Sequence, residues 1–380
     1  MTIGVDLRVL AKGTRTGIEE YTLNLLSRLL SLDKSVKFKL FYNAWNKEPL
    51  VYDWLKLSNV ELKKFRFPNR FVFDPLAKMF TWPHIDRLLG GADVFFSPHF
   101  LLSPVSPKCR QAITFHDLSF EYFPEFLPWR KRFWHASLSP KTRARQAQKI
   151  IAVSQSTKDD LVKLYGLPDK KIRVIYSGVG EEFKQLPLEN CSFVKQKYDL
   201  PDNFILYFGT IEPRKNIVGL IEAYDLFRQK LGQDSAPQLV IAGQTGWFYK
   251  ETLLAARRSA FSQDIIFTGF IEPSDKVYLF NLASLFVYPS FFEGFGFPPL
   301  EAMACGVPVI CSNTSSFPEV VGEAALMIDP YNFEELAWAI KEVWQDNNLR
   351  TDLIARGLAR AKNFSWQKCA KETLGFLTSS

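Results

Sequence analysis

Residues 284–313, which read SLFVYPSFFEGFGFPPLEAMACGVPVICSN, constrain the fold of this chain more than any other stretch. Leu285–Tyr288 is a short apolar run rich in β-branched and aromatic residues, which predicts a buried strand. A glycine-containing loop follows, and the pattern then predicts a helix over Leu300–Cys305 and a second buried strand over Val307–Cys311. A strand, a glycine-rich loop, a helix and another strand in this order are typical of an α/β protein with a ligand site at the loop.

Two carboxylates accompany this loop. Glu293 lies in the loop itself, and Glu301 is expected in the first turn of the helix, where the helix dipole favours a negative charge. The backbone N–H groups around Gly294 and Gly296 are available to an anion at the helix N-terminus. Carboxylates accept hydrogen bonds from hydroxyl groups. The stretch therefore predicts a site for a ligand that is both anionic and polyhydroxylated, such as a nucleotide sugar.

Length and composition predict a soluble protein with two domains. A chain of 380 residues is too long for one ordinary core, and 47% hydrophobic with 23% charged residues is ordinary for an α/β protein. The five cysteines are scattered and include no C-x-x-C pair, which argues against a disulfide framework or a structural zinc site and favours a reducing compartment. The sequence shows no signal peptide and no apolar run long enough to span a membrane. We therefore expect a cytoplasmic protein without a bound metal or cofactor.

The positive charge of the chain is concentrated in residues 129–149, WRKRFWHASLSPKTRARQAQK. This segment contains seven basic residues and no acidic one, and the net charge of the whole chain is +7. Trp129, Phe133 and Trp134 lie among the charges. One interpretation is a solvated helix face whose aromatic side chains point to the core. The main functional alternative is contact with an anionic membrane surface, whereas nucleic acid is not expected because no nucleic-acid-binding motif accompanies the charge.

The first half of the chain alternates predicted strands and helices. A strand at Thr2–Val5 is followed by a loop and by a helix over residues 18–30, with apolar residues at helical spacing. Further strands are predicted at Phe38–Tyr42, Val94–Ser97, Gln111–Phe115, Lys149–Val153 and Ile172–Tyr176. His116 comes directly after one of these strands, so it is expected at the carboxyl edge of a parallel sheet, where α/β ligand sites form. A neutral imidazole there can hydrogen-bond a sugar hydroxyl, and a purely structural histidine is the alternative.

The second half repeats the strand, loop and helix pattern after residues 181–203, a polar segment that we interpret as the interdomain linker. A strand is predicted at Phe204–Phe208, followed by Gly209 and then by Arg214 and Lys215. Two cations at the carboxyl end of a strand can neutralise a diphosphate leaving group. Strands are also predicted at Gln238–Ala242, which ends at Gly243, at Ile265–Thr268 and at Ala325–Ile328, and helices at Val218–Lys230, at Phe333–Gln345 and after Trp366.

Seven segments, spread in order over nearly the whole chain, are similar to one protein family. They are TGIEEYTLNLL (16–26), TFHDLSF (114–120), IIAVSQSTKDDL (150–161), YFGTIEPRKNI (207–217), FTGFI (267–271), EGFGFPPLEAMACGVPVI (293–310) and SSFPEVVGEAALMIDP (315–330). On these segments the chain resembles the retaining glycosyltransferases of family 4, which include bacterial mannosyltransferases. The resemblance implies the GT-B fold, with two Rossmann-like domains facing each other across a cleft. The expected domains are an acceptor-binding domain (1–181), a nucleotide-sugar donor domain (182–362) and a C-terminal helix (363–380) that crosses back to the first domain.

The resemblance also implies roles for individual residues. The expected catalytic residues are His116, at the reacting sugar and facing the acceptor, Arg214 and Lys215, which would hold the diphosphate, and Glu293, which would contact the donor sugar. Glu301 would bind the ribose hydroxyls. Phe270 and Ile271 would lie beside the base, and the amides around Gly296 and Phe297 would bind sugar hydroxyls. The other expected donor-binding residues are Gly17 in the first loop, Gly209, Gly243, Gly294 and Phe295. No metal site is expected.

The resulting expectation is transfer of a hexosyl group, with retention of anomeric configuration, from a nucleoside diphosphate sugar to a glycan or lipid-linked glycan in cell-surface polysaccharide synthesis. The expected donor is GDP-mannose, with a UDP-sugar as the alternative. The enzyme would be cytoplasmic and peripheral on the inner face of the membrane if the basic segment binds lipid. Three rivals are a sugar-nucleotide epimerase of the same fold, a non-catalytic sugar- or membrane-binding protein on this scaffold, and a two-domain dehydrogenase, which would need a G-x-G-x-x-G loop that the chain lacks.

Overall fold

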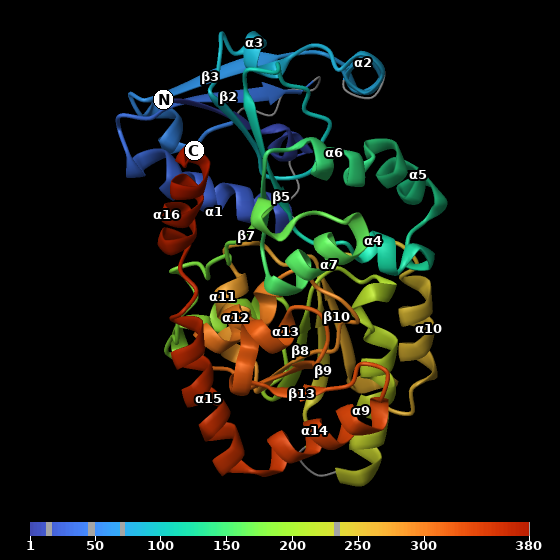
Figure 1. Ribbon diagram of the computed structural model, residues 1–380. Helices are drawn as coiled ribbons and strands as arrows, with labels where there is room; N and C mark the ends of the chain where they lie inside the picture. Colours follow the sequence, from blue (N-terminus) through green and yellow to red (C-terminus); the bar gives the residue numbers. More distant parts are fainter. Residues whose placement is uncertain (13–16, 45–49, 69–72, 232–235, 380) are drawn as a thin grey trace. The chain divides into compact units, whose positions relative to one another are not determined.

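The structure is a computed structural model that describes residues 1–12, 17–44, 50–68, 73–231 and 236–379 (Figure 1). The chain forms two compact units. The first comprises Met1–Leu118, Trp129–Gly178 and Ser365–Ser380, and the second comprises Ser119–Pro128 and Val179–Phe364. Gly13 and Arg15 of the first predicted loop lie outside the described residues.

The first unit is built on a seven-stranded parallel sheet with the order β3-β2-β1-β4-β5-β6-β7. Its strands are β1 (Thr2–Asp6), β2 (Lys37–Asn43), β3 (Val60–Phe65), β4 (Val94–Ser97), β5 (Arg110–Phe115), β6 (Lys149–Ala152) and β7 (Ile172–Val174). Its helices are α1 (Gly17–Leu32), α2 (Asp74–Phe80), α3 (Ile85–Leu88), α5 (Trp129–Leu138), α6 (Pro140–Gln146), α7 (Gln155–Tyr165) and α16 (Trp366–Thr378). The middle strands are buried on both faces, so they read as continuous apolar runs.

The second unit is built on a six-stranded parallel sheet with the order β10-β9-β8-β11-β12-β13. Its strands are β8 (Phe204–Phe208), β9 (Gln238–Ala242), β10 (Ile265–Gly269), β11 (Leu285–Tyr288), β12 (Val309–Ser312) and β13 (Leu326–Ile328). Its helices are α4 (Ser119–Tyr122), α8 (Ser192–Lys197), α9 (Ile217–Leu231), α10 (Lys250–Arg258), α11 (Lys276–Leu282), α12 (Phe297–Ala304), α13 (Phe317–Val321), α14 (Phe333–Gln345) and α15 (Asn347–Ala361).

Each sheet has a point at which the strand order reverses. In the second unit this point lies between β8 and β11, which pair in parallel with Leu285 opposite Ile205. The chain leaves these two neighbouring strands in opposite directions along the sheet, and in open α/β sheets ligands bind at the carboxyl ends of strands at such a point. The segments that follow β8 and β11 carry Gly209, Lys215 and Glu293. The topology therefore brings two predicted parts of the site to one sheet edge.

The predicted α/β class with two Rossmann-like sheets is confirmed. Most strands and long helices also agree with the sequence pattern, and five elements (β4, β8, β9, β11 and α14) have the predicted bounds. Several elements were not predicted, among them β3, α8, α10 and α15. The edge strand β3 carries Glu61, Lys63 and Lys64, which suit an exposed edge but hide the apolar alternation. Helix α15 begins after Asp346, whose carboxylate accepts hydrogen bonds from the N–H groups of Asn348 and Leu349.

The C-terminal helix packs in the first unit. The ring of Trp366, the first residue of α16, lies 5.8 Å from the ring of Tyr21 in α1. Gly178 leaves no room for a side chain, because a Cβ there would lie 2.1 Å from the backbone nitrogen of Trp366. The chain thus passes between the two units at Gly178 and again before Ser365.

None of the helices in the described part of the chain is long and apolar enough to cross a membrane. All five cysteines are buried free thiols. Burial raises the pKa of Cys109 and Cys369 to about 12.

Candidate active site

The edge of the second sheet is shaped by glycines at the ends of β8 and β9. Gly209 and Gly243 have φ angles of 157° and 138°, which side-chain-bearing residues rarely adopt. A Cβ on Gly243 would lie 2.0 Å from the carbonyl oxygen of Gly209, so the two loops can approach only without a side chain. Their backbones are joined to the neighbouring strand, since the Gly243 N–H donates to the Gly269 carbonyl at 2.9 Å.

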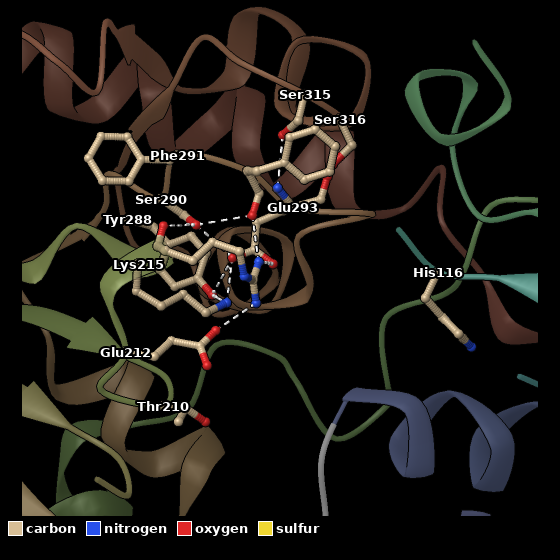
Figure 2. A network of polar contacts seen from close by, with 12 residues as sticks. His116, Thr210, Glu212, Lys215, Tyr288, Ser290, Phe291, Glu293, Ser315 and Ser316 are labelled. Carbon is tan, nitrogen blue, oxygen red and sulfur yellow. Dashed lines mark hydrogen bonds and ion pairs between the residues drawn. The ribbon is translucent and has the colours of Figure 1, made fainter. Parts of the chain in front are cut away.

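Arg214 and Lys215 meet Glu293 at this edge, and Figure 2 shows Lys215 beside Glu293. Both cations lie in or beside the short 3₁₀ turn Pro213–Lys215 after β8, and Glu293 lies in the loop after β11. Arg214 Nη1 is 3.0 Å from Glu293 Oε2, and Lys215 Nζ contacts Glu293 Oε1. Lys215 also donates to the hydroxyl of Tyr288 at 2.7 Å, and the hydroxyl of Ser290 donates to Glu293 Oε1 at 2.8 Å. The carboxylate is therefore held from several directions.

The electrostatics of the cluster follow from its burial. Burial alone would raise the pKa of Glu293, but the charges of Arg214 and Lys215 and hydrogen bonds from Lys215 and Ser290 lower it to about 2. Burial and the neighbouring Arg214 charge lower the pKa of Lys215, and Glu293 opposes that shift. Burial and the Glu293 charge raise the pKa of Tyr288 well above its usual range. Near neutral pH Glu293 is ionised, and Tyr288 keeps its proton.

The backbone of Glu293 is fixed by the segment after β12. The N–H of Glu293 donates to Ser315 Oγ at 2.9 Å, and Ser316 Oγ donates to the Glu293 carbonyl at 3.0 Å (Figure 2). Helix α12 then begins directly after Gly296, which has a φ of 92°. A Cβ on Gly296 would lie 2.9 Å from Phe317, so the turn that starts α12 requires glycine. Gly294 and Phe295 are buried in this turn, and Phe297 is the first residue of the helix.

The prediction that Glu301 lies in the first turn of the helix is wrong. Helix α12 starts at Phe297, three residues earlier than predicted, because Gly296 already makes the turn and Pro298-Pro299 fit the first helical positions. Glu301 is buried, and its carboxylate pairs with Lys276 of α11 at 2.6 Å. A cation from a neighbouring helix, rather than the helix dipole, compensates its charge.

Phe270 and Ile271 follow β10 at the same edge of the sheet. Phe270 is half exposed, whereas Ile271 is buried. The ring of Phe270 is thus open to a flat ligand such as a base, and Ile271 contributes to the core beneath it. Their contact with a base remains a prediction.

The other two predicted site residues, His116 and Gly17, belong to the first unit. His116 follows β5, at the predicted carboxyl edge, and is partly exposed. Its Nε2 lies 2.7 Å from the Pro98 carbonyl oxygen; because a carbonyl only accepts, Nε2 carries the proton and Nδ1 is the acceptor of the neutral ring. Burial lowers the pKa of His116, although the bond to Pro98 opposes this, so the ring is neutral near pH 7. Gly17 is the exposed first residue of α1.

Several residues of the site escaped the sequence analysis. Glu212 accepts a hydrogen bond from Arg214 at 2.9 Å, and Tyr288, Ser290 and Lys276 hold the two key glutamates. The position of Ser290, two residues after the end of β11, was a signal that could have been used. Lys276 gave no such signal, because nothing in its local sequence indicates that it pairs with Glu301, 25 residues along the chain. In the described ranges, no group of three His, Cys, Asp or Glu side chains could hold a metal ion.

Known proteins similar to this chain share both its sequence and its fold. The family described as "Glycosyl transferases group 1" matches residues 192–360, and "Glycosyltransferase Family 4" matches residues 15–183. The O-antigen chain mannosyltransferase B of Escherichia coli is 34% identical over 379 residues, covering 94% of this chain and 95% of that protein.

Two solved structures show the same architecture at low sequence identity. Sucrose-phosphate synthase from Thermosynechococcus elongatus superposes with a TM-score of 0.75 at 19% identity, covering 98% of this chain and 97% of its own. HepE from Anabaena, solved in complex with UDP and glucose, gives a TM-score of 0.74 at 18% identity, covering 100% and 99%. The chain belongs to glycosyltransferase family 4 and is a glycosyltransferase with the GT-B fold.

Proposed function

We propose that this glycosyltransferase, which takes its sugar from a nucleotide-sugar donor, transfers mannose from GDP-mannose to a hydroxyl of a growing glycan, with retention of anomeric configuration. The observation that supports the proposal most is the contact of Glu293 with Arg214 and Lys215 at the carboxyl ends of β8 and β11. The similarity to an O-antigen chain mannosyltransferase supports mannose as the sugar. A UDP-sugar is the alternative donor.

The two cations suit a diphosphate. Two of the three N–H groups of the Lys215 ammonium point to Tyr288 and Glu293, which fixes the direction of the third. The guanidinium of Arg214 is held between Glu212 and Glu293. Cations that are already oriented need little reorganisation when negative charge develops on the leaving diphosphate. We expect them to bind the diphosphate and to stabilise it as the glycosyl–phosphate bond breaks.

We infer a front-side reaction. The acceptor hydroxyl attacks the anomeric carbon from the side on which the diphosphate leaves, and a diphosphate oxygen takes the hydroxyl proton. Glu293 would orient the sugar through its hydroxyls, Glu301 would hold the ribose, and the amides of residues 294–297 would bind further sugar oxygens. His116 would accept or donate a hydrogen bond at the reacting sugar as a neutral imidazole.

The acceptor is proposed to be a glycan of a cell-surface polysaccharide, carried on a lipid while it grows. The enzyme would then work in the cytoplasm as a peripheral protein on the inner face of the membrane. The similarity to the Escherichia coli enzyme of O-antigen synthesis supports this class of acceptor.

A thermal-shift comparison with activity tests the proposal. GDP and GDP-mannose should raise the unfolding temperature of the wild type more than UDP and UDP-glucose do, because a ligand of the native state stabilises it. Lys215→Ala and Glu301→Ala should each lower transfer by about 100-fold or more, the scale of lost charge stabilisation or orientation. Lys371→Ala, an exposed lysine of α16, is the matched control. Near-normal transfer in either site variant would refute the assignment.

Incubation of the donor without an acceptor distinguishes the proposed transferase from the alternative, a sugar-nucleotide epimerase. A transferase of this kind leaves GDP-mannose largely intact, whereas an epimerase releases free sugar or an epimer. If UDP-sugars stabilise the protein more than GDP-mannose does, the proposed donor is wrong and a UDP-sugar takes its place, whereas the proposed type of reaction stands.

A further inference from the structure

The first turn of α5 exposes two large aromatic side chains. Trp129 is 67% exposed and Phe133 is 73% exposed. The two positions are four residues apart, so the side chains lie on one face of the helix. The interpretation that the aromatic residues of this segment point to the core is therefore wrong for these two. Trp134 is only partly exposed, and its ring packs against His135 at 4.8 Å.

Three basic residues, Arg130, Lys131 and Arg132, lie between the two aromatic residues, and all three are exposed. The guanidinium of Arg130 lies 5.3 Å from the ring centroid of Trp129. All five positions 129–133 are exposed, so the start of α5 presents two aromatic rings and three positive charges to its surroundings. Burial lowers the pKa of His135, in the last turn of the same helix, to about 4, so this residue adds no charge at neutral pH.

Three of the four remaining basic residues of the acid-free segment donate hydrogen bonds to backbone carbonyls of the same unit. Lys149 is buried, and its ammonium donates to the Phe376 carbonyl at 2.8 Å. Arg145 donates to the Tyr165 carbonyl at 3.1 Å, and Lys141 donates to the Leu164 carbonyl at 3.2 Å. The structure therefore narrows the candidate surface from residues 129–149 to residues 129–133.

We propose that residues 129–133 are a docking surface for an anionic lipid bilayer. Tryptophan and phenylalanine favour the boundary between headgroups and acyl chains, and basic residues beside them gain energy from a negative lipid surface. Among possible partners, this combination of exposed rings and positive charges fits a lipid interface best, since the rings enter the boundary while the charges stay with the headgroups. The inference concerns a partner of the first unit and does not depend on the identity of the donor.

A second group of exposed apolar residues lies in the same unit. Met79, Phe80 and Trp82, at and just after the end of α2, are 73%, 66% and 56% exposed, and Lys78 beside them is also exposed. Figure 1 draws α2 and α5 toward the right-hand side of the first unit.

Flotation of the full-length protein with vesicles tests the proposal. We expect binding to phosphatidylcholine vesicles that contain phosphatidylglycerol, little binding to phosphatidylcholine alone, and loss of binding at high salt because screening shortens the electrostatic range. The double variant Arg130→Gln with Arg132→Gln should weaken binding about 30-fold at low salt, roughly fivefold for each basic residue. Trp129→Ser with Phe133→Ser should also weaken binding at low salt, although it leaves every charge in place, because the apolar contact with the boundary is lost.

Matched control variants in the second unit distinguish lipid binding through residues 129–133 from lipid binding that depends only on the overall charge of the protein. Arg257→Gln with Arg258→Gln removes two exposed charges from the end of α10, and Trp338→Ser removes a half-exposed ring of α14. These variants should bind as the wild type does. Equal losses in control and α5 variants, or equal binding of the wild type to neutral and anionic vesicles, would overturn the proposal. Binding to single-stranded RNA but not to vesicles would overturn it in favour of nucleic acid.

The assay contains no donor or acceptor, so its failure leaves the proposed sugar transfer untouched. The α5 variants should fold as the wild type does, because the substituted side chains lie on the surface. An unchanged thermal shift with nucleotide would show separately that they are folded.

Discussion

Glu293 illustrates what a single residue contributes to this site. Its side chain is 12% exposed and carries a charge that burial alone would make costly. Arg214 and Lys215 compensate that charge, and in return the carboxylate compensates them. Removal of one partner of a buried ion pair therefore leaves the other uncompensated.

Glu293→Gln should destabilise the second unit at pH 7 by about 3–5 kcal/mol, because Arg214 and Lys215 lose their partner. The pKa of Glu293 is lower in the folded state, about 2, than the ordinary value of 4.5. Its contribution to stability is therefore complete above that ordinary value and is lost as the pH falls through the folded-state pKa. Denaturant unfolding between pH 7 and acid pH should show the wild type and the variant converging in this window.

Glu272→Gln, an exposed carboxylate in the same unit, is the control and should follow the wild type at every pH. A stability difference between wild type and Glu293→Gln that stays constant from neutral to strongly acid pH would contradict the ion-pair account.

Turns and helix starts set the geometry at the scale of the element. The sequence predicted backbone turns at the glycines that follow the strands, and a helix after the loop that contains Gly294 and Gly296. Both features depend on local backbone conformation. The sequence placed Glu301 one turn too early, because Gly296 and Pro298-Pro299 already start the helix, and the packing of Gly296 against the distant Phe317 is not visible in the local sequence. Element bounds are therefore less determined by sequence than element type.

Two glycine substitutions should have opposite effects. Gly243→Ala should destabilise the protein by about 2–5 kcal/mol, since it adds backbone strain and a collision with the Gly209 carbonyl. Gly375→Ala lies inside α16, where an added Cβ meets no atom within 4 Å in the described structure, and should stabilise by about 0.5–1 kcal/mol. Thermal unfolding of both variants measures the contrast, and a neutral Gly243→Ala would show that the two loops can separate.

At the scale of the whole molecule, one segment belongs to a different unit from its neighbours in sequence. Residues Ser119–Pro128 lie between two stretches of the first unit but pack in the second. The rings of Tyr122 and Phe123 lie 5.5 and 6.1 Å from that of Phe292, and Phe126 lies 5.7 Å from Phe291. These aromatic contacts cover the two residues that immediately precede Glu293.

Phe292→Ala should lower the stability of the second unit by about 3 kcal/mol and should also reduce transfer, because the loop that carries Glu293 loses its packing. Phe292→Leu, which keeps much of the apolar volume, should recover most of both losses. Phe193→Ala removes a half-exposed ring that packs against Tyr278 and is the matched control. Unfolding temperature and turnover should be measured on all three; full activity of Phe292→Ala would show that this packing does not position Glu293.

The sequence by itself determined the α/β class, the repeated strand, loop and helix pattern, and the placing of His116, Lys215 and Glu293 directly after strands or in the loops that follow them. These features are local, since apolar periodicity, glycines and prolines act within a few residues of one another. Only the tertiary structure decided the pairing of Lys215 with Glu293, which are 78 residues apart, and that of Lys276 with Glu301. Such partners are chosen by the order of strands in the sheet and by packing between elements, which no local pattern encodes. For the same reason, only the structure showed that Trp129 and Phe133 face outward and that Ser119–Pro128 packs in the second unit.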